Sequence, residues 1–339
     1  MGIEILAPGL LTSLQDEGRF GLQRSGMSPA GAMDQLSLAR ANILAGNPAG
    51  TGALEATYTG PTVKFTRGNI FALSGADMSP TLDGAPIPME AAVFAPAGSV
   101  LKLKNAKSGC RCYIAFHGGL DVPPVNGSQS TLLRSGIGGF KGRKLAAGDA
   151  IPFKAPAQTL RNLPLRRLAP RPPYPKEVTV RVVLGPQDDR FTPAGINTFL
   201  TQPFAVTMQA DRMASRLEGP KVEHVTDANM LSDGIPLGAV QVPGSGQPII
   251  MMSEHQGSGG YTKIATVIST DIALVAQCPP GGKIRFAAVT VEQAQAAYLA
   301  RKAELSRLEQ ALNAEYQATY HVTVGEQSFA VGIAERPGP

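Results

Sequence analysis

Short strand-like runs, separated by clusters of glycine and proline, are the feature that most constrains how this chain can fold. The 339 residues include 38 glycines and 28 prolines, which recur between the runs without a fixed period. Because both residues favour turns and interrupt regular elements, the pattern predicts many short strands joined by turns. Hydrophobic residues make up 43% of the chain, enough for a sizeable core. We therefore expect a mainly β protein with a few helices (α+β), built as two β-rich subdomains.

Strand patterns occur in both halves of the sequence. Residues 1–24 indicate a strand, a turn and a second strand. The segments 264–268 and 272–276 are apolar apart from Thr266, which is typical of strands buried on both faces. Further strands are predicted at 62–65, 100–104, 111–116, 178–184, 204–208, 235–242 and 248–252.

One short helix is predicted in the N-terminal half. Ser28-Pro29 is typical of a helix start, with Ser28 as the N-cap and Pro29 at the first helical position. The spacing of apolar residues that follows continues to Gly46, so the helix is expected near residues 29–45.

A longer helix is predicted over residues 291–315. Thr290 and Gln293 have the spacing of a capping box at its start. An apolar stripe along it either packs on the body of the protein or mediates assembly, and a hairpin with strands at 320–324 and 328–333 across a turn at 325–327 is expected to follow. The stripe consists of Tyr298, Leu305, Leu308 and Leu312.

These patterns divide the chain into four parts. Residues 1–162 form an N-terminal β-rich half with one short helix, and 176–289 form a C-terminal β-rich half. Between them, residues 163–175 are rich in proline and arginine, which is typical of a linker or strap. Residues 290–339 hold the C-terminal helix and the terminal hairpin.

Charge and cysteine content exclude several classes of protein. The net charge of +5 is spread along the chain without a dense basic block, which argues against a nucleic-acid partner. Three cysteines form no even disulfide framework and indicate reduced thiols in the cytoplasm. The four histidines lack metal-ligand spacing, so no metal site is expected. Neither a signal peptide nor a membrane-spanning run is expected.

The motifs of several catalytic mechanisms are missing from the sequence. It contains no phosphate-binding loop, no dinucleotide fingerprint, no nucleophile elbow and no carrier hairpin for biotin. We therefore expect this chain to bind no cofactor alone. If ATP or biotin takes part in its reaction, a partner subunit supplies it.

The polar loop at residues 253–263 is the densest candidate site, because it lies between two apolar strands. Glu254 and His255 offer acid and base groups. The other candidates in this loop are two glycines, which allow a ligand to approach the backbone closely, and two side chains with polar ends. The alternative is that the loop is a plain surface hairpin. These four residues are Gly259, Gly260, Tyr261 and Lys263.

Three further segments offer charged groups. A glycine-rich run at 131–149 places cations where they suit a carboxylate or a bicarbonate-like anion, or else it is a turn with solvated side chains. Asp211 and Arg212 face a cleft, or else Arg216 pairs with an acidic side chain on the surface. Arg24 and Ser25 precede the first predicted helix, whose N-terminus offers anion-binding N–H groups, although simple capping fits the spacing better. The cations of the glycine-rich run are Arg134, Lys141 and Arg143.

Ordered motifs recur along the sequence at residues 15–19, 21–34, 54–55, 118–125, 130–131, 138–149, 184–187, 211–213, 216–220, 238–243 and 259–265. Taken together, from about residue 3 to residue 288, they resemble the biotin-dependent carboxyltransferase-like family, which includes allophanate hydrolase subunit 2, the C subunit of 5-oxoprolinase and the carboxyltransferase domain of urea amidolyase. The loop before Gly259 departs from the family pattern, and Thr262 stands where proline is usual.

The resemblance implies a cyclophilin-like barrel and work in a complex. It implies an ATP-dependent 5-oxoprolinase subunit that acts on a small amide with a small cyclophilin-like partner and a third subunit. One alternative is a urea or amide carboxyltransferase that uses carboxybiotin from a partner, and another is a regulatory protein that binds a cyclophilin-like partner. Cations would hold an anion and an oxyanion, and Glu55, Asp211, Glu254 or His255 would accept a proton.

Overall fold

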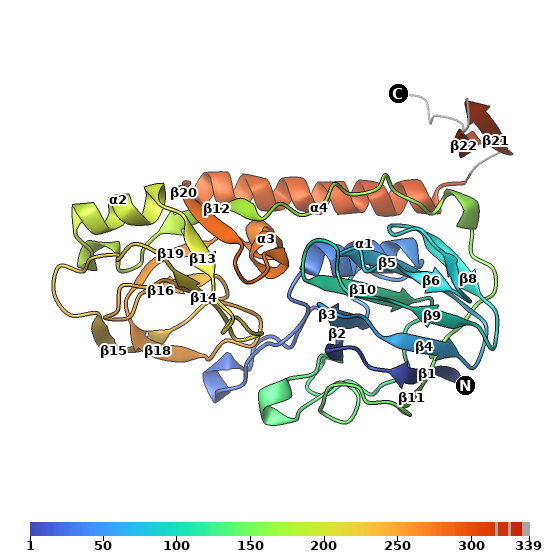
Figure 1. Ribbon diagram of the computed structural model, residues 1–339, viewed down its shortest axis with the longest axis horizontal. Helices are drawn as coiled ribbons and strands as arrows, with labels where there is room; N and C mark the ends of the chain where they lie inside the picture. The colour runs from blue at the N-terminus through green and yellow to red at the C-terminus, as the bar shows by residue number, and fades with distance from the viewer. Residues whose placement is uncertain (316–317, 325–326, 334–339) are drawn as a thin grey trace.

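The computed structural model describes residues 1–315, 318–324 and 327–333, and strands dominate it, as the glycine and proline pattern predicts. Figure 1 shows two halves side by side with one long helix lying across both. The half formed by residues 2–152 holds two sheets, and the half formed by residues 177–288 holds a closed barrel. The predicted mainly β fold with a barrel is therefore confirmed.

The N-terminal half is a sandwich of a six-stranded and a five-stranded sheet. Apolar side chains from both sheets, such as Phe65 and Ile114, form one buried core between them. The first sheet has the order β11 (Ala150–Pro152), β1 (Gly2–Ala7), β4 (Thr62–Phe65), β9 (Val100–Lys102), β6 (Thr81–Leu82) and β7 (Ala85–Pro86). The second has the order β2 (Leu11–Gln15), β3 (Ala53–Thr57), β10 (Arg111–Phe116), β5 (Asn69–Gly75) and β8 (Ala92–Ala95).

The five-stranded sheet has an apolar face and a polar face because side chains alternate along each strand. Leu54 and Ile114 point into the sandwich core. On the other face Ser13 lies opposite Glu55, and Glu55 lies opposite Tyr113. Helix α1 (Gln35–Leu44) packs on this polar face, next to β5 and β10. The sheet therefore carries a row of buried polar side chains outside the sandwich core.

The barrel of the second half closes through parallel pairing of its first and last strands, β12 and β20. The rings of Phe199 and Phe286 stack at 4.2 Å inside its hydrophobic core. Helix α2 (Pro193–Thr201) packs on β20, and a two-stranded sheet of β15 (Asn229–Gly234) and β18 (Ser258–Tyr261) adjoins the barrel. The barrel order is β12 (Glu177–Leu184), β19 (Lys263–Val267), β16 (Ala239–Gln241), β17 (Ile249–Met251), β14 (Ala214–Glu218), β13 (Phe204–Val206) and β20 (Lys283–Ala288).

Two sequence predictions about local structure are wrong. The first helix begins at Gln35, not at residue 29, and Asp34 caps it in place of Ser28. The apolar segment 272–276, predicted as a strand, belongs to helix α3 (Ile272–Gln277). A short apolar run fits a buried strand or a buried helix equally well, so its pattern does not discriminate between them.

The long C-terminal helix, α4 (Val291–Asn313), joins the two halves. Thr290 caps it in the predicted capping box. Leu305, Leu308 and Leu312 pack on the cluster that includes α1, which agrees with the first alternative for the apolar stripe, whereas Tyr298 is half exposed. The predicted hairpin is present as β21 (Ala318–Val324) and β22 (Gln327–Ile333), and residues 325–326 of its turn lie outside the described residues.

The proline-rich linker is held along the same side of the molecule. Figure 1 shows it running beside α4, after the short 3-10 helix η3 (Leu163–Leu165). Arg166 is buried and donates to the carbonyl of Ile43, at the end of α1, over 2.9 Å. The same guanidinium also binds the side chain of Asn313 at the end of α4.

Replacing Gly118 with alanine is expected to destabilise the N-terminal half strongly. Its φ of +71° is left-handed, and an added Cβ would lie 1.9 Å from the Ala155 carbonyl oxygen. Gly148→Ala is the matched control, because Gly148 has a φ of +84° and no atom within 4 Å of the added Cβ. The control should lose about 1–2 kcal/mol from backbone strain alone. Urea unfolding checks this, and equal losses for both variants would contradict the steric argument.

Candidate functional site

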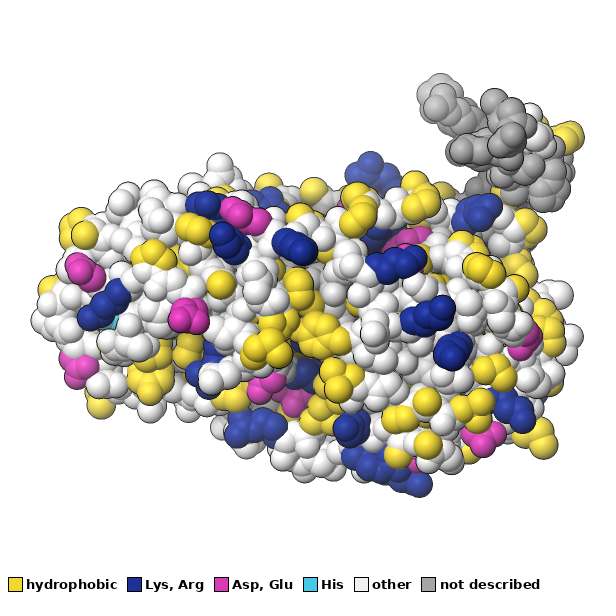
Figure 2. All heavy atoms as spheres, viewed as in Figure 1, with side chains coloured by type: hydrophobic (Ala, Val, Ile, Leu, Met, Phe, Trp, Pro, Cys, Tyr) yellow, Lys and Arg dark blue, Asp and Glu magenta, His cyan; other side chains and the backbone are white. Residues whose placement is uncertain are grey.

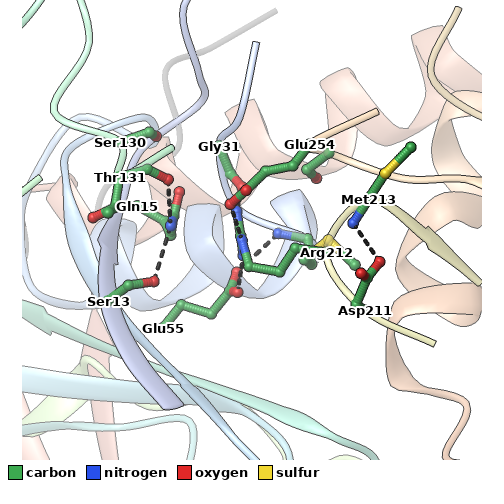
Figure 3. Close-up of polar contacts among 12 residues, drawn as sticks. Ser13, Gln15, Gly31, Glu55, Ser130, Thr131, Asp211, Arg212, Met213 and Glu254 are labelled. Carbon is green, nitrogen blue, oxygen red and sulfur yellow. Dashed lines mark hydrogen bonds and ion pairs between the residues drawn. The ribbon is translucent and has the colours of Figure 1, made fainter. Parts of the chain in front are cut away.

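One buried arginine joins the two halves. Arg212 lies in the loop before β14 and is 5% exposed. Its Nε donates to Glu254 Oε1 over 2.6 Å, its Nη2 donates to the Gly31 carbonyl over 2.6 Å, and its Nη1 donates to Glu55 Oε1. Figure 3 shows these contacts converging on the guanidinium. A carboxylate from each half therefore shares a single buried cation.

Glu55 is held in place from its other side. Its Oε2 accepts hydrogen bonds from the Tyr113 hydroxyl at 2.7 Å and from the Met33 N–H at 2.8 Å. The Tyr113 oxygen in turn accepts from the Asp34 N–H at 2.8 Å. Burial, and then the neighbouring charge of Glu55, raise the pKa of Tyr113 well above its usual value, so the phenol remains a donor.

A second polar contact between the halves forms at the start of α1. The Asp34 carboxylate caps the helix by accepting from the Ser37 N–H at 2.9 Å, and it accepts from Gln277 Nε2 at 2.8 Å. Gln277 belongs to α3 of the second half, and its side-chain oxygen also accepts from the Cys110 and Arg111 N–H groups. A side chain therefore fills the N-terminus of α1.

At the start of α1 the structure shows capping, with Asp34 rather than Ser28 as the capping residue. Arg24 and Ser25 form part of a 3-10 helix, η1 (Gln23–Ser25), well before the start of α1. Ser28 lies at the junction, where its hydroxyl donates to the Ser253 carbonyl over 3.3 Å. Its side chain thus bridges the two halves.

The two carboxylates of the buried cluster stabilise the protonated guanidinium of Arg212. Burial acts to lower the pKa of Arg212, but the charges of Glu55 and Glu254 outweigh it and raise that pKa above the usual value. Burial lowers the pKa of Arg19, against the opposing charges of Asp16 and Glu254. A second buried arginine thus lies within electrostatic reach of the cluster.

Three of the predicted site residues meet in this cluster, namely Glu55, Arg212 and Glu254. Asp211 is adjacent but serves a turn, because its Oδ1 accepts from the Met213 and Ala214 N–H groups at 2.8 and 2.9 Å. Arg134 reaches the same loop from the N-terminal half, with its Nη1 2.8 Å from the Met213 sulfur.

The remaining cations of the glycine-rich run lie elsewhere. Arg143 forms a two-pronged ion pair with Asp149, with both N–O distances at 2.7 Å, and its side chain is 41% exposed. The Lys141 Nζ lies 5.0 Å from the centroid of the Phe140 ring. These contacts agree with a turn that carries solvated side chains.

The glycine loop of the second half forms part of a two-stranded sheet. Gly259, Gly260 and Tyr261 lie in β18, which pairs with β15. Lys263 is 1% exposed, and its Nζ binds Asp233 at 2.7 Å and the Gly234 carbonyl at 3.1 Å. This lysine therefore anchors β15 to the barrel.

Glu254 and His255 are adjacent in sequence but make separate contacts. His255 is buried, and its Nδ1 lies 2.9 Å from the Gln256 carbonyl oxygen. Burial lowers the pKa of His255, against the raising effect of that hydrogen bond. We find no hydrogen bond between the two side chains in the described part of the chain, so His255 serves as a buried neutral side chain.

Four residues around this cluster have no role predicted from the sequence, namely Arg19, Asp34, Tyr113 and Gln277. Glu55 depends on Tyr113, and the contact between the halves at α1 depends on Asp34 and Gln277. Arg19 lies in the matching segment 15–19, which was the only signal that pointed to it. Their importance comes from tertiary partners that no spacing reveals.

The described residues offer neither a metal site nor a disulfide as another candidate site. They contain no group of three or more His, Cys, Asp or Glu side chains that could hold a metal ion. All three cysteines are buried and unpaired. Within the same residues, no helix is long and apolar enough to cross a bilayer.

Comparison with known sequences decides the family. The profile described as "Carboxyltransferase domain, subdomain A and B" matches residues 25–288, which span both halves and the Arg212 cluster. The chain belongs to the carboxyltransferase domain family. Within this family it is 38% identical over 299 residues to the C subunit of 5-oxoprolinase from Escherichia coli (strain K12), an alignment that covers 86% of this chain and 93% of the relative. The corresponding protein of Haemophilus influenzae is 37% identical, with 89% and 96% of the two chains covered.

A solved structure supports the same assignment. The urea amidolyase of K. lactis superimposes with a TM-score of 0.84 at 29% sequence identity. The match covers 94% of this chain but 21% of the urea amidolyase. The family resemblance seen in the sequence is thus confirmed.

Removing Arg212 is expected to destabilise the protein by about 3–5 kcal/mol, because Arg212→Ala leaves Glu55 and Glu254 buried without a counter-ion. Arg161→Ala is the control, since its ion pair with Glu315 is exposed and should contribute less than about 1 kcal/mol. Urea denaturation of both variants measures the difference. A loss at Arg212 no larger than that at Arg161 would refute the central role of this ion pair.

Acidification is expected to lower the stability of the protein, because His255 is buried in its neutral form. Its folded pKa is below the usual value, so the unfolded chain binds a proton more readily as pH falls below about 6.5. Stability is therefore fully present above that pH and is lost on further acidification, by at most about 1.4 kcal/mol per pH unit for this group. Urea midpoints from pH 7.5 to 5 should fall less steeply for His255→Gln. Parallel curves for variant and wild type would exclude this contribution.

Proposed function

We propose that this chain is the C subunit of an ATP-dependent 5-oxoprolinase, which opens the lactam of 5-oxoproline to glutamate together with partner subunits. The observation that carries the proposal is the match to the C subunit of the Escherichia coli 5-oxoprolinase, which covers 93% of that relative. The similar urea amidolyase is a much longer chain, of which this protein corresponds to 21%. The higher sequence identity, 38% against 29%, also favours the 5-oxoprolinase relationship.

In the proposed reaction, the Arg212 cluster positions the proton acceptor. Glu254 Oε1 is occupied by Arg212, and within the described residues its Oε2 accepts no hydrogen bond, so Oε2 is the atom that would take a proton. Arg212 also binds Glu55, so any movement of Glu254 is coupled to the N-terminal half. The depth of the cluster keeps bulk water away from the charges and strengthens their interactions.

Partner subunits supply the remaining chemistry in this proposal. The sequence has no phosphate-binding loop, and ATP would therefore be bound and used by a small cyclophilin-like subunit and a third subunit. ATP would supply the phosphoryl group that activates the amide. This chain would bind and orient the lactam. The assembly would operate in the cytoplasm.

A second candidate function is carboxyl transfer to urea or another amide, with carboxybiotin brought by a partner. The TM-score of 0.84 to a urea amidolyase favours it as the alternative. Both reactions hold a small amide beside a proton acceptor, so the same cluster would serve either one. A regulatory protein that binds a cyclophilin-like partner without turnover is the third candidate.

The proposal predicts ADP release that depends on both 5-oxoproline and this chain. The protein should be co-purified with its two genomic neighbours and assayed by coupled ADP release. Turnover should vanish when this chain is omitted, and Glu254→Gln, which keeps the shape of the side chain, should lower kcat at least about a hundredfold. An intact complex without turnover would reject the oxoprolinase proposal, and turnover with carboxybiotin and urea would establish the alternative.

A further inference from the structure

Two buried polar atoms near the Arg212 cluster have no hydrogen-bond partner among the residues that the structure describes. They are the Nη1 of Arg19 and the Oε1 of Gln15. Arg19 is 1% exposed and Gln15 is fully buried, so neither atom is satisfied by bulk solvent. Unpaired buried donors and acceptors are costly and uncommon, and a ligand or an ordered water usually explains them.

Both side chains are anchored to the same short segment, at Ser130 and Thr131. Arg19 Nη2 donates to the Ser130 carbonyl, and Gln15 Nε2 donates to the Thr131 carbonyl at 3.1 Å. Gln15 Nε2 also donates to Ser13 Oγ at 2.9 Å. Because the Thr131 carbonyl can only accept, the amide group of Gln15 must keep its nitrogen on that side and its oxygen on the other.

The anchoring segment is itself rigid. Asp16 accepts hydrogen bonds from the Ser128 hydroxyl at 2.6 Å, the Gln129 N–H at 2.6 Å and the Ser130 hydroxyl. Asp16 also accepts from the Gly18 N–H at 2.8 Å. The Asp16 carboxylate is therefore occupied by this segment and accepts no hydrogen bond from Arg19 Nη1.

The two unpaired atoms flank the cluster. Gln15 points from the same sheet face as Ser13, which lies directly opposite Glu55. Arg19 lies within electrostatic reach of Glu254. Figure 3 places the Gln15 amide between Thr131 and the Arg212 cluster. One unpaired donor and one unpaired acceptor thus lie in the part of the N-terminal half that adjoins the cluster.

On the face of the molecule seen in Figure 2, acidic and basic side chains lie beside apolar ones between the two halves. We propose that Arg19 and Gln15 form a recognition site for a cis-amide group, in which Arg19 Nη1 donates to the carbonyl oxygen and Gln15 Oε1 accepts from the N–H. A cis-amide presents both groups on one edge, as lactams and cyclic ureas do, and it satisfies both unpaired atoms at once. This inference rests on the proposed function for its choice of 5-oxoproline as the natural ligand. Both residues precede the segment 25–288 that matches the family profile.

The arrangement also predicts selectivity for the N–H. A ligand with a carbonyl but without an N–H would leave Gln15 Oε1 buried and unpaired, and sites built around a hydrogen bond discriminate strongly against such analogues. 2-Pyrrolidinone and imidazolidin-2-one carry the full edge. 1-Methyl-2-pyrrolidinone keeps the ring and the carbonyl but lacks the N–H.

The test measures binding of these three probes to the complex by ligand-observed NMR, alongside KM for 5-oxoproline. We expect the two N–H probes to bind at least about tenfold more tightly than the N-methyl probe. Arg19→Lys keeps the charge but not the forked donor, and it should weaken both N–H probes about tenfold. Gln15→Met should bring their affinity down to that of the N-methyl probe. Arg285→Lys, on the exposed surface of the barrel, is the matched control and should change nothing.

The outcomes separate this site from the proposed function. Turnover of 5-oxoproline with KM unchanged in Arg19→Lys and Gln15→Met would overturn the site and leave the function standing. Selective probe binding that both variants weaken, without turnover, would support the site and reject the function. Equal binding of all three probes, or no binding of any, would overturn the site and show that the two atoms hold an ordered water only. Circular dichroism spectra and urea midpoints confirm that each variant is folded.

Discussion

The ion pairs of Arg212 determine how the two halves of this protein fit together. A guanidinium from the barrel half binds a carboxylate from each half and a backbone carbonyl from the N-terminal half. Buried charges of this kind are costly unless every one of them is paired. The positions of the halves and the shape of the site are therefore a single property, because neither can change without breaking these contacts.

The alternation of side chains along the five-stranded sheet explains why a site exists at this place. Leu54 and Ile114 face the sandwich core, while their neighbours Glu55 and Tyr113 face α1 and the barrel. The same strands thus build the stability of one half and the polar surface that meets the other. Partnered groups fill most of that surface, and Gln15 Oε1 is one of the atoms on it that has no hydrogen-bond partner among the described residues.

The fold was largely predictable from sequence because glycine and proline mark the strand ends and the capping box marks α4. The segment 272–276 was not, since its apolar pattern has no period that separates helix from strand. In the site, Arg212 and Glu254 were recognisable as charged residues in polar loops. Their partners Tyr113 and Gln277 were not, because a buried hydroxyl or amide acquires its role only from distant residues. His255 follows Glu254 directly in sequence, yet its ring contacts the neighbouring Gln256 carbonyl, which adjacency alone does not reveal.

The chain passes between the halves along α4, once through the linker and once through the helix itself (Figure 1). Arg166 fastens the two passages together at the N-terminal half. Both covalent connections between the halves thus lie on one side of the molecule. On the side away from α4 the halves are held together by non-covalent contacts alone, so the Arg212 ion pairs have to supply there what the chain itself supplies along α4.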